Sequence, residues 1–187
     1  AGWLETTIPQ LEGCSYNAVQ DPFLAEVRAD YSIDGISARY TSFICATQNT
    51  LVVDVENTGS EKLNVNFCTM PGIYSTAEIY GYADGIREDT VWTEYPAEPQ
   101  NLPGRRWVFT GVTTDVSAVY TPEKMVRKGG HFDLKPGEKA HVLLTMLSDL
   151  DSPDAKEETH RLTLLSKVEY RKLREVHRKW WEDYWVS

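Results

Sequence analysis

The chain lacks the long apolar runs and short motifs that mark several large classes of protein. No stretch of its 187 residues approaches the roughly 20 consecutive apolar residues that a membrane-spanning helix needs. The motifs GxSxG, GxGxxG, HExxH and the phosphate-binding P-loop are also absent. The sequence therefore gives no signal of a membrane span, or of the catalytic and nucleotide-binding sites that these motifs build.

Cysteine is scarce, and histidine is not spaced as a metal site requires. Cys14, Cys45 and Cys68 are odd in number and show no CxxC spacing, so they predict neither a zinc site nor a disulfide framework. Cys45 shares strand parity with Phe43 and is interpreted as a small core residue. The four histidines have no two-ligand helical spacing, so we predict no metal and no cofactor.

Positive charge is the minority sign. Nineteen Lys and Arg stand against 28 Asp and Glu, which gives a formal net charge of −9. This balance argues against nucleic acid and anionic membrane surfaces as partners, since both attract clustered cations. The basic residues between 171 and 179 alternate with glutamates, which is typical of a solvated helix face.

What the chain does contain is a series of alternating segments rich in β-formers. Residues 1–37 are weakly patterned, but alternation beyond them predicts antiparallel strands with one buried face. Turn clusters at 57–61 and 135–138 predict two hairpins, each joining the strands on either side. The predicted strands are 38–47, 51–56, 63–68, 107–112, 118–120, 131–134 and 139–147.

The longest irregular region is predicted at 70–106, and it is rich in aromatic residues. Trp92 and Tyr95, with Trp107 just beyond, are candidates for flat surfaces that stack on sugars or pack against a neighbouring domain. Packing is the favoured interpretation. We predict that the loop lies at one end or face of the fold and directs Trp92 or Tyr95 toward another domain or its substrate.

The same region is acidic, and paired carboxylates are what glycoside hydrolysis needs. In a chain with 28 acidic residues, solubilising charge is the favoured interpretation, and no catalytic residue is predicted. The acids concerned are Asp84, Glu88, Asp89, Glu94 and Glu98.

Helical patterns replace β patterns after residue 148. Ser152-Pro153 predicts a helix start, and that helix is expected to reach about residue 165. Ser166 and Glu169 have the spacing of a capping box, which predicts a second helix from residue 167. Strands first and helices last indicate an antiparallel β-sandwich over 1–148, followed by a helical linker over 149–187.

The second helix becomes more aromatic toward its end. Trp180 and Tyr184 share one helical face, and Trp181 and Trp185 share a face about 100° round from it. We predict that Trp180 and Tyr184 face the sandwich together with Leu173 and Val176, and that Trp181 and Trp185 are at least partly exposed. The last turn carries no capping residue, glycine or polar tail. We therefore interpret the chain as one part of a longer protein, joined to the next domain by this helix.

The layout and this helix together resemble bacterial glycoside hydrolases and related phosphorylases. In those proteins an N-terminal β-sandwich and two linker helices lead into a catalytic (α/α)6 barrel. The resemblance rests on the turn at 135–138, the hydrophobic strand at 140–147 and the pattern His-x-x-Trp-Trp-x-x-aromatic-Trp at 177–185. It implies a mainly β fold, of the supersandwich or galactose-mutarotase type, and a secreted or periplasmic location. The barrel with its catalytic acids is absent from this chain, so no catalytic residue is carried over.

Three functions are consistent with the sequence. The first is a non-catalytic sandwich domain of a glycoside hydrolase, whose partner is the missing catalytic domain of the same protein. The second is an independent carbohydrate-binding module, which requires Trp92, Tyr95 and Trp107 to form an exposed platform. The third is a structural or adhesion module without a ligand. Among these, the first accounts best for the aromatic helix.

Overall fold

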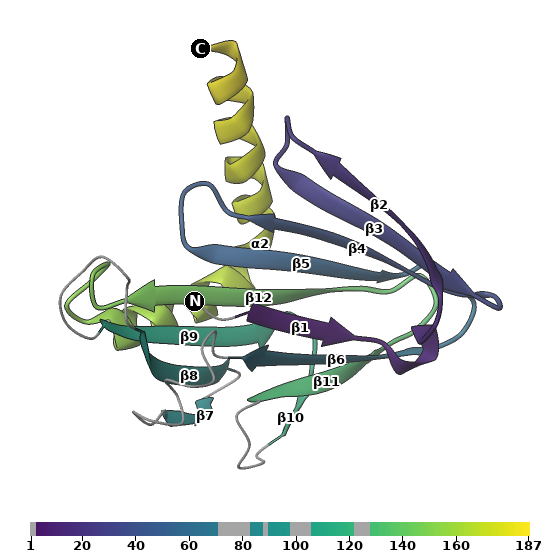
Figure 1. The fold of residues 1–187 in the computed structure, drawn as a ribbon, viewed down its shortest axis with the longest axis horizontal. Helices are drawn as coiled ribbons and strands as arrows, with labels where there is room; N and C mark the ends of the chain where they lie inside the picture. Colours follow the sequence, from purple (N-terminus) through teal and green to yellow (C-terminus); the bar gives the residue numbers. More distant parts are fainter. Residues whose placement is uncertain (1–2, 71–82, 88–89, 98–105, 122–127) are drawn as a thin grey trace.

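The fold is an antiparallel β-sandwich with a helix laid across one sheet, as Figure 1 shows. The mainly β class predicted from the alternation is confirmed. The computed structural model describes residues 3–70, 83–87, 90–97, 106–121 and 128–187.

The larger sheet has eight strands, and all of its pairings are antiparallel. In spatial order these are β2 (Ser15–Asp21), β3 (Glu26–Ile33), β4 (Ile36–Ile44), β5 (Thr50–Asn57), β12 (Lys139–Ser148), β9 (Arg106–Thr114), β8 (Thr90–Ala97) and β7 (Ala83–Arg87).

The smaller sheet has four strands and covers one face of the larger sheet. A short 3-10 helix, η1 (Pro9–Leu11), leads from its first strand toward β2. In spatial order the strands are β1 (Trp3–Thr7), β6 (Leu63–Met70), β11 (Lys128–Leu134) and β10 (Val119–Thr121).

The main core fills the space between the two sheets. Val53 and Val55 of β5 and Val142 of β12 are buried there against the smaller sheet. On the opposite face of the same strands, Val52 and Leu143 are buried with Leu173 of the helix. The central strands are therefore covered on both faces, and both carry apolar residues on each face.

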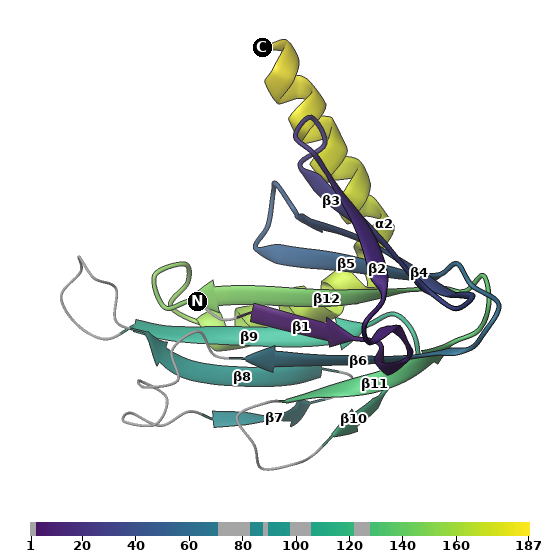
Figure 2. The same cartoon turned by 45° about the vertical axis from the view of Figure 1, so that its right-hand side comes forward.

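The helix α2 (Ala155–Val186) crosses the outer face of the larger sheet. Its first half lies directly on β9, because Gly111 has no side chain. A Cβ at Gly111 would come within 2.3 Å of Oγ1 of Thr163. The C-terminal part of α2 extends past the sheet beside the β2–β3 hairpin (Figures 1 and 2). Among the described residues, no helix has the length and apolar content needed to cross a membrane.

The two predicted helices form one helical run that is interrupted at Glu169, with φ −107° and ψ 16°. The predicted capping box is wrong. Ser166 does not cap a new helix, since its hydroxyl donates to the carbonyl of Leu162 at 2.7 Å. The N-terminal boundary is also later than expected, because the N-cap is Asp154 and the helix begins at Ala155.

Several strands were not predicted. Residues 1–37 contain β1, β2 and β3, and the region from 70 to 106 contains β7 and β8 rather than a single irregular loop. The residues of β2 are exposed up to Gln20, with only Asp21 partly covered, so this edge strand shows no alternation of burial. Hydrophobic periodicity identifies strands with one buried face and misses a strand of this kind.

Both predicted hairpins are wrong. The turn after β5 leads to β6, but β5 pairs with β4 and β12 while β6 pairs with β1 and β11. The turn after β11 likewise leads from the smaller sheet to β12 in the larger one. Each turn is a crossover between sheets. Alternation shows that a strand has a buried face, but it does not show which strand lies beside it.

Asn57 holds the two crossovers together. Its side chain is 1% exposed, and Nδ2 donates to the carbonyls of Glu61 at 2.7 Å and Leu134 at 3.0 Å. Its backbone carbonyl accepts from the amide of Gly137 at 3.0 Å. One asparagine thus satisfies polar groups from both turns at the edge of the sandwich.

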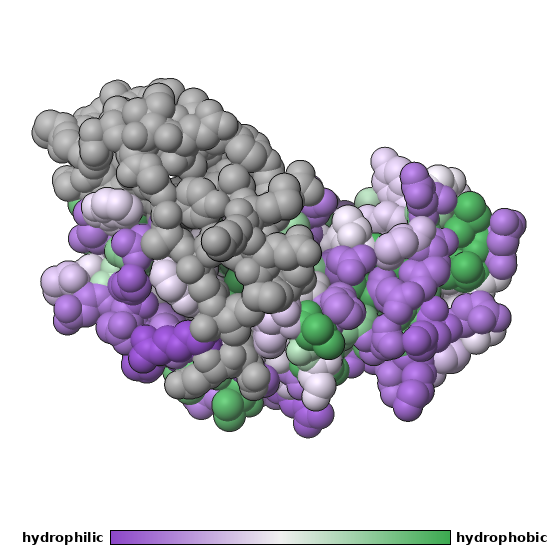
Figure 3. All heavy atoms as spheres, turned by 90° about the horizontal axis from the view of Figure 1, so that it is seen from below, coloured by the Kyte–Doolittle hydropathy of each residue, from purple (hydrophilic) through white to green (hydrophobic). Residues whose placement is uncertain are grey.

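Away from the residues drawn in grey, the surface in Figure 3 is mainly hydrophilic, with separate hydrophobic patches.

We expect Asn57→Ala to lower the free energy of unfolding by about 2–3 kcal/mol, because it leaves buried carbonyls without donors. Urea unfolding followed by circular dichroism measures this, with an unchanged m-value. Asn17→Ala, on the exposed edge strand β2, is the matched control and should change stability by less than about 0.5 kcal/mol. Equal effects of the two substitutions would show that Asn57 does not join the crossovers.

Candidate functional site

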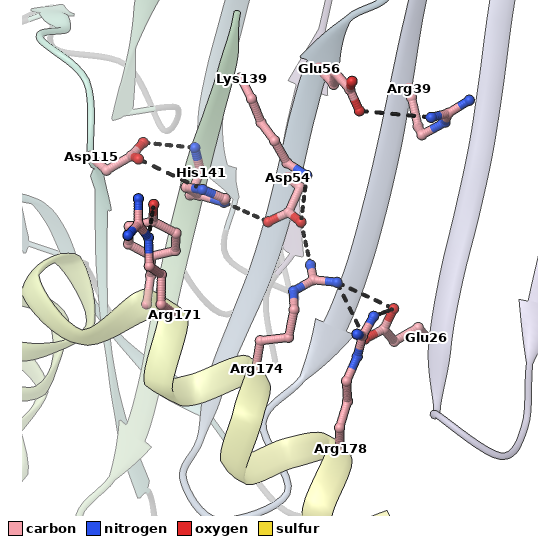
Figure 4. A network of polar contacts seen from close by, with 11 residues as sticks. Glu26, Arg39, Asp54, Glu56, Asp115, Lys139, His141, Arg171, Arg174 and Arg178 are labelled. Atoms are coloured by element: carbon pink, nitrogen blue, oxygen red, sulfur yellow. Dashed lines mark hydrogen bonds and ion pairs between the residues drawn. The ribbon is translucent and has the colours of Figure 1, made fainter.

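A network of charged side chains lies between the larger sheet and the second half of α2 (Figure 4). Its centre is Asp54 on β5, which is 2% exposed. Oδ1 of Asp54 accepts from Nδ1 of His141 at 2.6 Å, while Oδ2 binds the guanidinium of Arg174 and lies 3.6 Å from Nζ of Lys139. Both carboxylate oxygens are therefore occupied by partners from β12 and α2.

Glu26 on β3 forms the second part of the network. It is 7% exposed and binds two arginines one helical turn apart. The distances are 3.0 Å to Nε of Arg178 and 3.3 Å to Nη1 of Arg174. Arg174 thus bridges the two buried carboxylates, and the helix is tied to β3 and β5 at once.

His141 extends the network toward the loop after β9. Its backbone amide donates to Oδ1 of Asp115 at 2.8 Å, and its ring lies 3.9 Å, centroid to centroid, from that of Tyr170. Nε2 of His141 is 3.8 Å from Oδ2 of Asp115. His141 is thus held in place by Asp54 and Asp115, and Tyr170 of the helix covers its imidazole ring.

The electrostatics of Asp54 indicate a structural role. Burial raises the pKa of the Asp54 carboxyl, but the hydrogen bond from His141 and the positive charges of Arg174 and Lys139 outweigh it, so the pKa ends below its ordinary value. A carboxylate that stays ionised and has no open oxygen is not placed to take a proton from a substrate. The network therefore docks the helix and does not form a catalytic pair.

His177 is the most deeply buried large side chain of the second half of α2. It is 0% exposed, its Nε2 donates to the carbonyl of Leu24 at 2.8 Å, and its ring lies 4.5 Å, centroid to centroid, from that of Phe43. Nδ1 is buried and has no hydrogen-bond partner among the described residues. Burial lowers the pKa of this imidazole, so His177 is neutral at pH 7.

The predicted buried face of this helix is partly wrong. Leu173 is buried as expected, but the next buried position is His177, whereas Trp180 is 41% and Tyr184 54% exposed. Trp185 is 49% exposed, as predicted. The buried stripe is rotated by one residue because the arginines at 174 and 178 must reach the carboxylates of the sheet. No apolar pattern records that constraint.

The aromatic residues at the end of α2 pack mainly on one another, and we call Trp180, Trp181, Tyr184 and Trp185 the aromatic end. The rings of Trp180 and Tyr184 are stacked at 5.5 Å with an interplanar angle of 9°. The turn between β2 and β3 contributes a partner, since Trp185 lies 5.3 Å from the ring of Phe23 and donates from Nε1 to its carbonyl at 3.2 Å. The aromatic end is thus fixed in position and still largely open to solvent.

Two of the three aromatic candidates of the sequence, Trp92 and Trp107, lie apart on neighbouring strands. Trp92 on β8 is half-buried, and Nζ of Lys156 on α2 sits 4.8 Å from its ring centroid. Trp107 on β9 is 38% exposed. Trp92 pairs with Gly111, which is four residues along β9 from Trp107, or about 13 Å of strand. The backbone of Tyr95 belongs to β8, and its side chain lies outside the described residues.

A small cavity of about 140 Å³ lies between the first turns of α2 and the strands β8 and β9. Trp92 and Lys156 line it, and Lys156 is neutralised by Glu94 at 2.6 Å. The side chain of Asp84 and the residues Glu88, Asp89 and Glu98 lie outside the described part of the chain. In that part, no group of three or more His, Cys, Asp or Glu side chains is arranged to hold a metal ion.

Titration of His177 should make the fold sensitive to mild acid. The pKa of His177 in the folded chain lies below its value of about 6.5 in the unfolded chain. Burial of the neutral ring therefore contributes fully to stability above about pH 6.5, and this contribution is lost as the pH falls toward the pKa of the folded chain. We expect the free energy of unfolding, measured with urea from pH 8 to 5, to fall less steeply in His177→Gln than in the unmodified chain. Gln20→Asn, an uncharged substitution at an exposed position of β2, is the control and should leave the slope unchanged. Parallel curves for all three proteins would exclude His177 as the acid-sensitive group.

Comparisons with known proteins reveal the fold and not a sequence family. No protein-family model matches the chain, and no curated protein matches it in sequence. A solved structure described as "Putative kojibiose phosphorylase from human microbiome" has a TM-score of 0.68 at 7% identity, over 95% of this chain and 27% of its own. A bacterial glucoamylase complexed with acarbose has a TM-score of 0.61 at 11% identity, over 97% of this chain and 31% of its own. The chain therefore has the fold of one portion of these longer proteins.

Proposed function

We propose that the chain is a non-catalytic β-sandwich domain of a carbohydrate-active enzyme, which packs on a helical catalytic domain and helps to shape it. The observation that carries the proposal is the unequal coverage of the structural matches. Nearly all of this chain superposes on less than a third of a glucoamylase and of the described phosphorylase. A secreted or periplasmic location belongs to the same proposal.

The aromatic end supports this role. Burial of exposed apolar area contributes about 25 cal/mol per Å², and Trp180, Tyr184 and Trp185 are each between 41% and 54% exposed. A rigid aromatic cluster rimmed by charged residues such as Lys179 and Asp183 is typical of a surface that another domain covers. The polar network fixes its direction, since α2 cannot rotate without breaking the ion pairs of Arg174 and Arg178.

The geometry gives less support to an independent carbohydrate-binding module built on Trp92, Tyr95 and Trp107. Trp92 is half-buried beside α2, with Lys156 over its ring, so one face is already occupied. Trp107 lies about 13 Å away along the neighbouring strand. Trp92 is therefore better explained as packing beside the helix.

The proposal is tested by the coding sequence that follows Ser187 and by the longer protein it encodes. We expect a helical domain there, and a longer protein that cleaves or phosphorolyses glycosides. A natural stop after Ser187, or a following domain without glycoside activity, would contradict the proposal.

The 187-residue chain alone should cleave no glycoside, because the sequence shows no catalytic motif and the buried carboxylates Asp54 and Glu26 are both paired with arginines. The measurement uses aryl α- and β-glycosides and oligosaccharides, each with and without inorganic phosphate. Rates should equal those of a heat-inactivated sample. Turnover that is lost in Glu94→Gln would place a catalytic acid in this chain and refute the expectation.

The isolated chain should self-associate through the aromatic end at high concentration. The double variant Trp180→Gln, Tyr184→Gln should weaken this association, measured by sedimentation equilibrium, and should change stability by less than about 1 kcal/mol because both side chains are largely exposed. Val168→Gln, on the same helix and 81% exposed, is the matched control and should have no effect. If the double variant unfolds the domain, these residues belong to its own core and need no partner.

A further inference from the structure

A row of three tyrosines crosses the inner face of β2, β3 and β4, on the side that faces the smaller sheet. Tyr16 and Tyr31 are paired in register with ring centroids 6.0 Å apart and nearly parallel, at 28°. Tyr31 and Tyr40 are 5.5 Å apart and edge-to-face, at 76°. Tyr16 is 70% exposed, while Tyr31 and Tyr40 are half-buried against the main core. The row therefore runs from the core out to the open edge of the sheet.

A half-open cavity of about 560 Å³ adjoins this row. Its walls are Tyr31 and Tyr40 on one side, and the end of β1 with the η1 segment on the other. The volume lies within the range of about 300–1,000 Å³ that is usual for ligand pockets. Tyr16 continues the floor beyond the mouth, so a ligand in the cavity would meet an aromatic surface across three strands.

The charges around the cavity select the class of ligand. Among the described residues that line it, Glu12 is the one ionised side chain, and none is a lysine, arginine or histidine. A phosphate or carboxylate ligand would find no cation there. The lining instead offers hydroxyl groups, from Thr6 and Thr7 and from the tyrosines.

The hydroxyl of Tyr40 is already oriented. Burial raises the pKa of Tyr40 to about 12, although a hydrogen bond with Thr6 opposes the shift. Tyr40 therefore keeps its proton throughout the physiological range and remains a hydrogen-bond donor or acceptor. The half-buried rings of Tyr31 and Tyr40 are held in place before any ligand arrives, which reduces the entropy lost on binding.

We propose that the tyrosine row and its cavity bind a neutral saccharide. A pyranose ring has an apolar face of C–H groups, which suits the rings of Tyr16 and Tyr31, and a rim of hydroxyls, which suits Thr6, Thr7 and Glu12. The site is separate from the aromatic end and from Trp92, Tyr95 and Trp107. Sugar binding at this site goes beyond the proposed docking role. The choice of sugars as probes is the one point that rests on that proposed function.

The test is a calorimetric titration of the 187-residue chain with maltohexaose, cellohexaose and xylohexaose. At least one should bind, and Tyr16→Ala should weaken that binding at least fivefold. Tyr16 lies exposed on an edge strand, so the thermal unfolding temperature should stay unchanged. Tyr31→Phe keeps the ring and removes the hydroxyl, and it should weaken binding less than Tyr31→Ala. Val19→Ala, on the opposite face of the same strand and 56% exposed, is the control and should leave affinity unchanged.

The proposal is overturned if none of the three sugars binds at millimolar concentration, or if Tyr16→Ala and Tyr31→Ala leave binding intact. It is also overturned if Tyr16→Ala abolishes a dimer, seen by light scattering, without affecting sugar binding. The row would then be a protein contact. These outcomes are independent of domain docking, which the variants at Trp180 and Tyr184 report. If the chain binds sugar but does not dock on another domain, the proposed function is wrong and the sugar site stands.

Discussion

The central strands of the larger sheet have two faces to bury, and the rest of the structure follows from that constraint. β5 and β12 place Val53 and Val142 on one face and Val52 and Leu143 on the other. The smaller sheet covers the first face, and among the described elements α2 covers the second. The helix is therefore part of the fold of this domain.

The two halves of α2 solve this problem by different chemistry. The first half comes close to the sheet over Gly111, where backbone and side chain meet without space for a Cβ. The second half relies on a small apolar contact around Leu173 and on ion pairs of Arg174 with Asp54 and Glu26. A buried ion pair contributes little net stability, because desolvation offsets much of the attraction, but breaking one partner is costly. Such a network specifies a position more than it strengthens the fold.

That position has a functional consequence. Because the ion pairs set the rotation of the helix, His177 points into the sheet while Trp180 and Tyr184 point away. The domain thus presents a rigid aromatic surface at one place and a tyrosine row on the opposite face of the same sheet. Helix docking and sugar binding would then use separate surfaces, so a single sandwich can serve an enzyme both as a spacer and as a point of contact with substrate.

The sequence by itself determined the β class, the approximate position of several strands, and the presence of an aromatic helix at the end of the chain. These features rest on local periodicity, which each segment carries alone. The sequence did not determine which sheet β6 or β12 would join. A turn of the same length can close a hairpin within one sheet or cross from one sheet to the other. Nor did the sequence indicate the pairing of Asp54 with Arg174, or of Tyr16 with Tyr31. Those contacts join residues far apart or on an edge strand without alternation, so only the tertiary structure decided them.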